Sequence, residues 1–311
     1  MKTQHIGKTG LVSTRLSYGC MRIAGGWEPD KVTAEDEKRG IAAVIAAWEA
    51  GYRLFDHADI YCDVVGESIF GKALKQVHGM RSQVLIATKC GIRWEGVPNP
   101  DSPHRYDFSA EHILKSCDDS LNRLGVETID IYQLHRPDVL MNPEEVAGAF
   151  AKLAKAGKVR TFGVSNFLPS QVSALQAHLS MPIAVNQVEI HPGRLDCFTD
   201  GTLDQCLALN ITPLSWSPLG GGRYGDGATA KAGDEKGAGV LKELDRAAKI
   251  YGVSRAAVVL AWLMKHPTGI IPIVGSANPD RIKEAARADG VDISRDDWYR
   301  ILLAARGKPL P

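Results

Sequence analysis

The sequence predicts a single α/β domain, a (β/α)8 or TIM barrel, that spans residues 1–311. Short apolar runs alternate with amphipathic stretches along the whole chain, which is typical of repeated βα units on a parallel sheet. Eight such runs can be counted, and no linker of altered composition divides the 311 residues. This length agrees with one barrel, because α/β barrels often run past about 250 residues as a single unit.

Eight apolar runs are the predicted strands of the barrel. Each has the length of a buried strand, and most are followed by a helical pattern with a plausible cap. They lie near residues 16–19, 53–58, 84–89, 129–134, 161–165, 184–189, 212–216 and 270–274. Eight is also the number of strands in this type of barrel.

Three helices between these strands are marked by their ends. One follows Thr33, where acidic residues fill the first turn and Gly51 lies just past the end. Another covers roughly residues 109–124. A third begins at the sequence NPEEV, with Pro143 in its first turn and Gly157 as its stop. Helix and strand therefore alternate as a (β/α)8 barrel requires.

Three segments outside this alternation are also interpretable. Residues 1–15 hold the turn-like sequence GKTG, which predicts an N-terminal hairpin that closes the bottom of the barrel. Residues 220–239 are rich in Gly and Ala without apolar periodicity, so we expect a long mobile loop, either a tolerated insertion or a lid. The segment RWEGVPNPDSPHRYDF is too long for a plain turn and is expected to shape one wall of the site.

Charge and composition exclude several classes of partner. The 37 Lys and Arg residues against 36 Asp and Glu residues leave a net charge of +1, which gives no overall field for nucleic acid or an anionic membrane. No apolar run is long enough to span a bilayer, and MKTQHIGKTG lacks the apolar core of a signal peptide. The six cysteines show no CxxC pair, which indicates free thiols. We expect a cytoplasmic protein whose partner is a small molecule. The sequence does not indicate its oligomeric state.

Polar side chains end nearly every predicted strand, at the edge where such barrels carry their active sites. Asp56 ends the second strand, Lys89 ends the third, and His135 follows the fourth. Singly, each has a structural explanation: Asp56 could cap a helix, Lys89 could pair with it, and His135 could be a hydrogen-bonded core residue. Together they indicate a site. A metal is not expected there, because the paired-histidine HxH pattern is missing and Lys89 would repel a cation.

Acid–base chemistry fits these residues better. Lys89, held as a cation beside Asp56, is expected to lower the pKa of a neighbouring tyrosine, and Tyr61 lies five residues after Asp56. Tyr61 would donate a proton at neutral pH while His135 orients a carbonyl oxygen. None of these groups supplies electrons, so a hydride-carrying cofactor is required. No GxGxxG follows the first strand, which argues against the dinucleotide-binding mode of a Rossmann fold.

The chain resembles the aldo-keto reductases over nearly its whole length. The resemblance rests on the sequences FDHADIY, ATKCG, DSLNRLGVETIDIYQLHRPD, GKVRTFGVSNF, NQVEIHP and WSPLGGG, in that order. The HADIY and LHRPD forms are similar to those of a bacterial branch of NADPH-dependent oxidoreductases. The resemblance implies a catalytic tetrad of Asp56, Tyr61, Lys89 and His135, with Tyr61 as the general acid in reduction and the general base in oxidation.

The resemblance also implies NADPH or NADP+ as the cofactor. Ser165, Asn166 and Gln187 would hold the nicotinamide carboxamide, Trp216 would stack on its ring, and Arg281 would bind the 2′-phosphate that NAD lacks. Further contacts are implied for Gly19, Met21 and Arg22 on the near side of the cofactor, for Ser217, Pro218, Leu219 and Gly220 at the pyrophosphate, and for Gly275, Ser276 and Glu284 at the adenosine end.

The function that the resemblance implies first is reduction of small aldehydes or ketones to alcohols by NADPH. Trp27, Trp94 and Tyr106 are candidate walls of the substrate pocket, or equally packing residues under loops. Two alternatives stay open. One is a cofactor-bound regulatory or interaction subunit, as in the ion-channel β subunits of the same fold. The other is an NADP-dependent alcohol or sugar dehydrogenase that works in the direction of oxidation.

Overall fold

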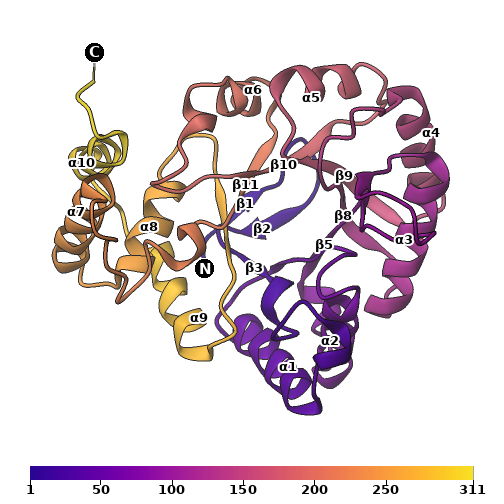
Figure 1. The fold of residues 1–311 in the computed structure, drawn as a ribbon, viewed down its shortest axis with the longest axis horizontal. Helices are drawn as coiled ribbons and strands as arrows, with labels where there is room; N and C mark the ends of the chain where they lie inside the picture. The colour runs from indigo at the N-terminus through magenta and orange to yellow at the C-terminus, as the bar shows by residue number, and fades with distance from the viewer. Residues whose placement is uncertain (311) are drawn as a thin grey trace.

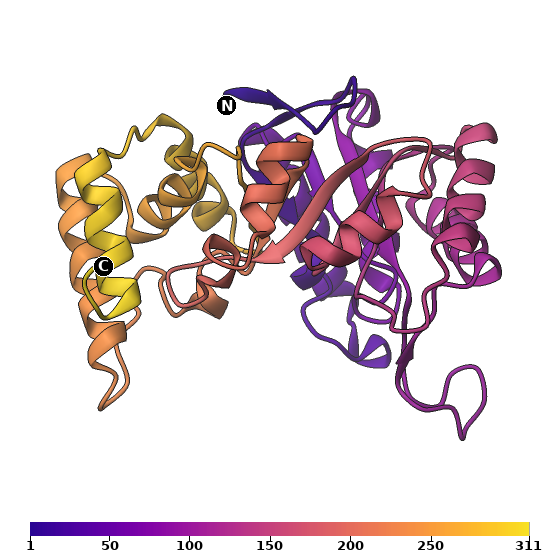
Figure 2. The same cartoon turned by 90° about the horizontal axis from the view of Figure 1, so that it is seen from above.

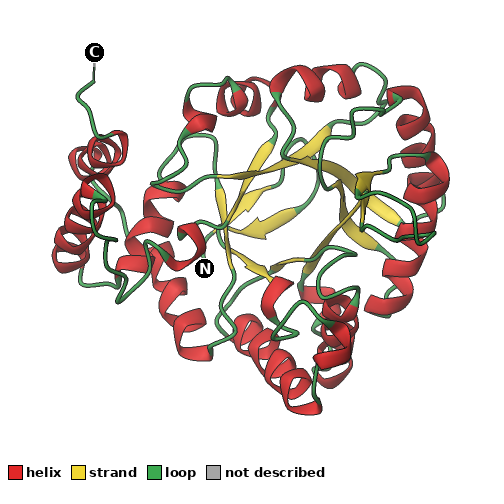
Figure 3. Cartoon of the chain, in the orientation of Figure 1, coloured by secondary structure: helices red, strands yellow, loops and turns green. Residues whose placement is uncertain are grey.

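Eight parallel strands form a closed barrel at the centre of the computed structural model, which describes residues 1–310 (Figures 1 and 3). Every neighbouring pair is parallel, including β12 with β3, which closes the ring. The predicted (β/α)8 barrel is confirmed, and all eight predicted runs are barrel strands. In order around the barrel they are β10 (Ile183–Glu189), β11 (Thr212–Trp216), β12 (Ile271–Val274), β3 (Ser17–Gly19), β4 (Leu54–Asp56), β5 (Leu85–Cys90), β8 (Ile129–Leu134) and β9 (Val159–Ser165).

A ring of helices surrounds the strands (Figure 3). Two further helices, α7 (Glu235–Tyr251) and α10 (Arg295–Arg306), pack against each other outside this ring (Figure 1). No single helix within residues 1–310 is long and apolar enough to cross a membrane; α7 and α8 (Arg255–Met264) meet that criterion of length and composition only as a pair bent by 92°. The helices of the ring are α1 (Ala34–Glu49), α2 (Val65–Gln76), α3 (Ala110–Leu124), α4 (Pro143–Lys155), α5 (Pro169–Gln176), α6 (Thr202–Leu209), α8 (Arg255–Met264) and α9 (Pro279–Ala286).

The predicted helix ends are confirmed by their caps. The Thr33 hydroxyl accepts a hydrogen bond from the Asp36 backbone N–H, and the Asp36 carboxylate accepts one from the Thr33 backbone N–H, which together form a capping box at α1. At α4, Asn142 caps the first turn and Pro143 takes the first helical position. Gly125 ends α3 in the left-handed conformation, with φ of 66°.

The N-terminal hairpin closes one end of the barrel (Figure 2). Its strands β1 (Thr3–His5) and β2 (Val12–Thr14) are antiparallel. The loop between them carries Ile6 and Leu11, which are buried in one apolar cluster with interior residues of the barrel such as Leu214. The predicted hairpin is confirmed, and the barrel interior at this end is filled by side chains.

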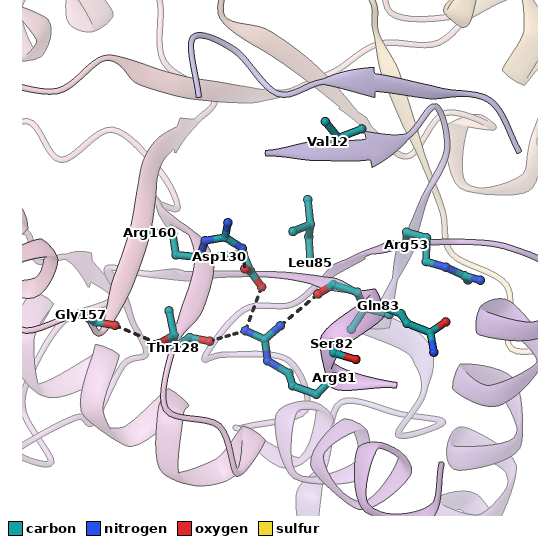
Figure 4. Close-up of a pocket in the computed structure, with 11 residues that line it drawn as sticks. Val12, Arg53, Arg81, Ser82, Gln83, Leu85, Thr128, Asp130, Gly157 and Arg160 are labelled. Atoms are coloured by element: carbon teal, nitrogen blue, oxygen red, sulfur yellow. Dashed lines mark hydrogen bonds and ion pairs between the residues drawn. The ribbon is translucent and has the colours of Figure 1, made fainter. Parts of the chain in front are cut away.

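A hollow of about 540 Å³ lies beside the hairpin at the same end (Figure 4). Its arginines are already bound. Arg81 donates to the carbonyls of Val84 and Thr128 and forms an ion pair with Asp130, and Arg160 donates to the other oxygen of Asp130 at 2.7 Å. Since Asp130 is buried, these pairs stabilise its charge. The charged groups that line the hollow therefore have a structural role. The polar residues predicted to form the site lie at the opposite, carboxyl ends of the strands.

The segment 220–239 differs from the sequence prediction. Residues 235–239 are the start of α7, so the prediction of a loop is wrong for them. Asp234 caps the helix by accepting from the Gly237 N–H, and Val240 is buried in the next turn. The Gly- and Ala-rich sequence hides this turn because it has no apolar period. The preceding loop is held in place, since Arg255 donates to the carbonyls of Gly225 and Ala228.

The long segment after β5 contains a second hairpin that the sequence did not reveal. Its strands are β6 (Ile92–Arg93) and β7 (Arg105–Tyr106), which pair in antiparallel register. The hairpin projects away from the barrel at the end opposite β1 and β2 (Figure 2). The segment therefore extends beyond the carboxyl ends of the barrel strands.

Candidate active site

Four polar side chains meet at the carboxyl ends of three neighbouring strands. Asp56 is the last residue of β4, Lys89 lies near the end of β5, and His135 directly follows β8. Tyr61 lies in the loop after β4. The structure thus brings together the four residues proposed as the tetrad, although Asp56 and His135 are 79 positions apart in the sequence.

Lys89 is the centre of this group. Its ammonium nitrogen donates to Asp56 Oδ2 at 2.9 Å, to the His57 carbonyl oxygen at 2.6 Å and to the Tyr61 hydroxyl oxygen at 3.2 Å. These bonds use all three protons of the ammonium group. Burial opposes the charge, but Asp56 and Tyr61 together raise the pKa of Lys89 above its ordinary value. Lys89 is therefore a fully buried cation.

Tyr61 accepts a hydrogen bond from Lys89, which leaves its own O–H free to donate. Burial raises the pKa of the Tyr61 hydroxyl, and Lys89 lowers it by a smaller amount. Lys89 thus acts on the pKa of Tyr61 in the predicted direction, but burial, which the sequence analysis did not consider, outweighs it and the pKa lies above its ordinary value. At neutral pH Tyr61 is a protonated phenol, which is the form that a proton donor needs.

His135 lies beside Tyr61, with the two ring centroids 6.1 Å apart and nearly perpendicular. Burial lowers the pKa of His135 well below its ordinary value, and Lys89 and Arg136 lower it further. The ring is therefore a neutral imidazole. Its Nδ1 atom is buried and has no hydrogen-bond partner within residues 1–310.

A chain of hydrogen bonds connects this group to Trp216. Gln187 Nε2 donates to Asp56 Oδ1 at 2.8 Å, and Ser165 Oγ donates to the Gln187 carbonyl at 2.9 Å. Asn166 Nδ2 donates to Ser165 Oγ at 2.8 Å, and Trp216 Nε1 donates to Asn166 Oδ1 at 2.9 Å. Asn166 has a positive φ of 62°, a conformation that costs energy for a residue other than glycine. The network fixes the orientation of the indole.

The other predicted cofactor residues follow three strands that are adjacent in the barrel. These strands are β11, β12 and β3, so segments from both ends of the sequence share one side of the candidate site. Tyr18 joins two of the groups by donating to the Ser276 carbonyl at 2.9 Å. The groups are Gly19 at the end of β3 with Met21 and Arg22 after it, Ser217, Pro218, Leu219 and Gly220 after β11, and Gly275, Ser276, Arg281 and Glu284 after β12.

Charge and backbone shape differ among these residues. The exposed side chains of Arg22 and Arg281 form no ion pair with any carboxylate of residues 1–310. Glu284 is already engaged, because it accepts from the Ser254 N–H and from Arg287. At Gly220 an added Cβ would meet the Tyr224 ring at 3.0 Å, whereas at Gly221 and Gly222, which directly follow it, a Cβ would meet nothing within 4 Å, and φ is 68° and 99°. The backbone there is open to a ligand.

Of the predicted pocket residues, the structure brings Trp27 to the tetrad. Its ring packs edge-on against Tyr61, with centroids 6.3 Å apart, and 53% of the residue is exposed. Trp94 and Tyr106 lie on either side of His104 in the projecting hairpin, at 5.6 and 6.1 Å between centroids. Their described aromatic contacts are with His104 and not with the tetrad.

Two residues at the site were missed by the sequence reasoning. The carbonyl of His57 binds Lys89, while its ring is fully buried and neither ring nitrogen has a partner in the described chain. The guanidinium carbon of Arg136 lies 5.4 Å from the ring centroid of Trp216. Both directly follow a tetrad residue, and that adjacency was the available signal.

No group of three or more His, Cys, Asp or Glu side chains within residues 1–310 is arranged to hold a metal ion.

Comparison with known proteins gives matches over the whole barrel. The model of the Aldo/keto reductase family matches residues 15–303. A 6-dehydroglucose reductase from Novosphingobium aromaticivorans is 41% identical, covering 99% of this chain and 97% of that protein. A protein of the same name from Agrobacterium fabrum is 36% identical and covers 96% of each. The solved structure of a glycerol dehydrogenase from Gluconobacter oxydans superposes with a TM-score of 0.85 at 26% identity, covering 99% of this chain and 97% of that one.

Proposed function

The chain belongs to the aldo/keto reductase family, and on this premise we propose that it reduces small aldehydes or ketones to alcohols, with NADPH as hydride donor and Tyr61 as proton donor. The observation that carries the proposal is the contact of 3.2 Å between the Lys89 ammonium and the Tyr61 hydroxyl oxygen. A protonated phenol beside a fixed cation is suited to give up its proton to a carbonyl oxygen. We propose that residues 1–311 form one aldo/keto reductase domain.

In the proposed reaction each tetrad residue has a separate task. Tyr61 passes its hydroxyl proton to the substrate oxygen, and Lys89 stabilises the phenolate that remains. Asp56 holds Lys89 in place through the bond at 2.9 Å. The neutral ring of His135 orients the carbonyl oxygen. NADPH, when bound, supplies the hydride to the carbonyl carbon. In the reverse direction Tyr61 accepts the proton of the alcohol.

Several features fit a phosphate-bearing nicotinamide cofactor. Arg22 and Arg281 are cations without carboxylate partners in the described residues, and Arg281 would bind the 2′-phosphate. The open backbone at Gly221 and Gly222 allows close approach of a pyrophosphate. The indole of Trp216, fixed by Asn166, offers a face for the nicotinamide. We infer that NADPH is preferred over NADH.

The names of the relatives guide the choice of substrate and direction. Two are 6-dehydroglucose reductases and the structural neighbour is a glycerol dehydrogenase, so hydroxyl-rich carbonyl compounds and the matching alcohols are the first to test.

The six cysteines are all free and buried, which suits a reducing compartment, and we infer a cytoplasmic location.

A substrate screen tests this function directly. The purified protein is incubated with NADPH and a panel of aldehydes and ketones, including glyceraldehyde and other hydroxyl-rich members, and the absorbance of NADPH is followed. We expect saturable turnover on several members of the panel. Tight binding of NADPH without turnover on any carbonyl would instead support the regulatory or interaction subunit.

A further inference from the structure

Arg136 occupies a distinctive position at the edge of the tetrad. It directly follows His135 at the carboxyl end of β8, and its side chain is half-buried. The guanidinium carbon lies 5.4 Å from the centroid of the Trp216 ring, in a cation–π contact. Arg136 thus adjoins His135 through the chain and Trp216 through space, on the side of the site where the carbonyl oxygen is proposed to lie.

This guanidinium has no acidic partner. Within residues 1–310 its side chain forms no ion pair and no hydrogen bond. The nearest carboxylate in the sequence, Asp138, is committed elsewhere, because its two oxygens accept from the backbone N–H groups of Leu140 at 2.9 Å and Phe108 at 3.1 Å. The cation–π contact compensates only part of the hydration that a half-buried cation loses, and no N–H donor of the guanidinium is used within residues 1–310, so an oxygen-bearing ligand would be favoured there.

Other arginines near the carboxyl ends of the strands show the contrast. Arg93 pairs with Asp107 at 3.4 Å, Arg194 pairs with Asp196 at 2.8 Å, and Arg223 pairs with Asp234. Arg22 and Arg281 are unpaired but exposed, and both lie in the segments assigned to the cofactor. Arg136 is the unpaired arginine that adjoins the tetrad.

The contact with Trp216 leaves the N–H donors of Arg136 available for a ligand. The indole is held by its hydrogen bond to Asn166, and Asn166 donates in turn to the His135 carbonyl at 3.3 Å. A guanidinium that lies over an aromatic ring leaves its edge of N–H donors free, and that edge matches two neighbouring oxygen atoms. We propose that Arg136 binds a pair of oxygen atoms on the substrate, so that preferred carbonyl compounds carry a carboxylate or adjacent hydroxyl groups. This role rests on the proposed function, since it orients a carbonyl toward Tyr61.

Three matched substrates and three variants test this role. Butanal has no second oxygen, succinic semialdehyde carries a carboxylate, and glyceraldehyde carries adjacent hydroxyl groups. We expect Arg136→Gln to lower kcat/KM for one or both of the latter by on the order of 10- to 100-fold relative to butanal, because hydrogen bonds to a charged group are lost. Arg136→Lys keeps the charge but not the paired donors, so its loss should be intermediate.

Arg194→Gln is the control for charge, because it removes one positive charge from a paired arginine at the same end of the barrel. It should change the three substrates alike. The substrate that suffers most from Arg136→Gln identifies the oxygen pair as a carboxylate or as adjacent hydroxyl groups. Equal losses on all three substrates, in a variant whose thermal unfolding matches the wild type, would overturn the role of Arg136.

Equilibrium binding separates this role from the proposed function. Succinate and xylitol present the two kinds of oxygen pair without a reactive carbonyl, and their binding can be followed by titration calorimetry. Tighter binding of either probe to the wild type than to Arg136→Gln supports the role even if no carbonyl compound is turned over. Equal affinity of both proteins for both probes rejects it, whatever the outcome of the substrate screen.

Discussion

The ammonium nitrogen of Lys89 donates a hydrogen bond to the hydroxyl oxygen of Tyr61 across 3.2 Å. The direction of this bond matters, because it leaves the phenolic proton unshared within the pair. It also places a positive charge next to the oxygen that becomes negative when the proton leaves. A buried tyrosine with a raised pKa can therefore remain protonated at rest and still release its proton during the reaction.

Replacement of Tyr61 by phenylalanine should remove the proton donor while it keeps the ring. We expect Tyr61→Phe to lower kcat by about 10²- to 10⁴-fold, the usual contribution of general acid catalysis. The dissociation constant for NADPH should stay within about twofold, because the ring remains packed against Trp27. Initial rates and fluorescence titration measure the two quantities. Tyr299→Phe on α10 is the control, and a kcat above a tenth of normal for Tyr61→Phe would contradict the assignment.

Arg281 should decide the choice between the two nicotinamide cofactors. Because only NADPH carries the 2′-phosphate, Arg281→Ala is expected to weaken NADPH binding by on the order of 10- to 100-fold and NADH binding much less. Titration calorimetry with each cofactor gives the comparison. Arg300→Ala is the control for charge, since Arg300 is an exposed arginine on α10, outside the segments assigned to the cofactor. Equal weakening of both cofactors by Arg281→Ala would remove the phosphate role.

His57 should make the fold sensitive to acid. Burial, aided by Lys89, lowers the pKa of His57 to about 3, whereas an unfolded histidine titrates near its ordinary value of 6.5. Between these values the unfolded chain binds more protons, so stability falls as the pH drops from 6.5 toward 3. When the pH is lowered from 6.5 to 4.5, the unfolding free energy of His57→Leu should fall by about 2 kcal/mol less than that of the wild type. Urea denaturation at both values tests this, and parallel losses would show that His57 does not titrate as stated.

Two glycines inside helices should respond to alanine in opposite directions. At Gly40 in α1 an added Cβ would collide with the backbone carbonyl of Ile23, so Gly40→Ala should destabilise the protein by about 1–3 kcal/mol. At Gly148 in α4 nothing lies within 4 Å, so Gly148→Ala should stabilise it by about 0.5–1 kcal/mol. Chemical denaturation of both variants measures the difference. Changes of the same sign would refute the packing described around Gly40.

The barrel and the convergence of three tetrad positions could be predicted because their signals are local. A run such as LIATK shows both a buried strand and the polar residue that ends it, and parallel strands bring such ends to one edge. Asp56, Lys89 and His135 each carry this signal. The rule needs no knowledge of which strands are neighbours, so it succeeds from sequence alone.

Other features depend on distant contacts or on very short segments. The hairpin of β6 and β7 has two residues in each strand, too few for an alternating pattern to be visible. The direction of the Tyr61 pKa shift follows from burial by the whole fold, which the nearby Lys89 does not reveal. Likewise, Arg136 follows β8 and Trp216 ends β11, two strands that are not adjacent in the barrel, and their contact emerges only when the ring is closed.

The N-terminal hairpin has a consequence for how the protein is made. Ile6 and Leu11 are synthesised first, yet they are seated against Ala184, Leu214 and Ile271, which leave the ribosome much later. The ring itself is completed only when β12 reaches β3. The closed ring and its packed N-terminal end therefore cannot form until β12 has been synthesised, and the sheet of any part that folds earlier keeps unpaired edges until then.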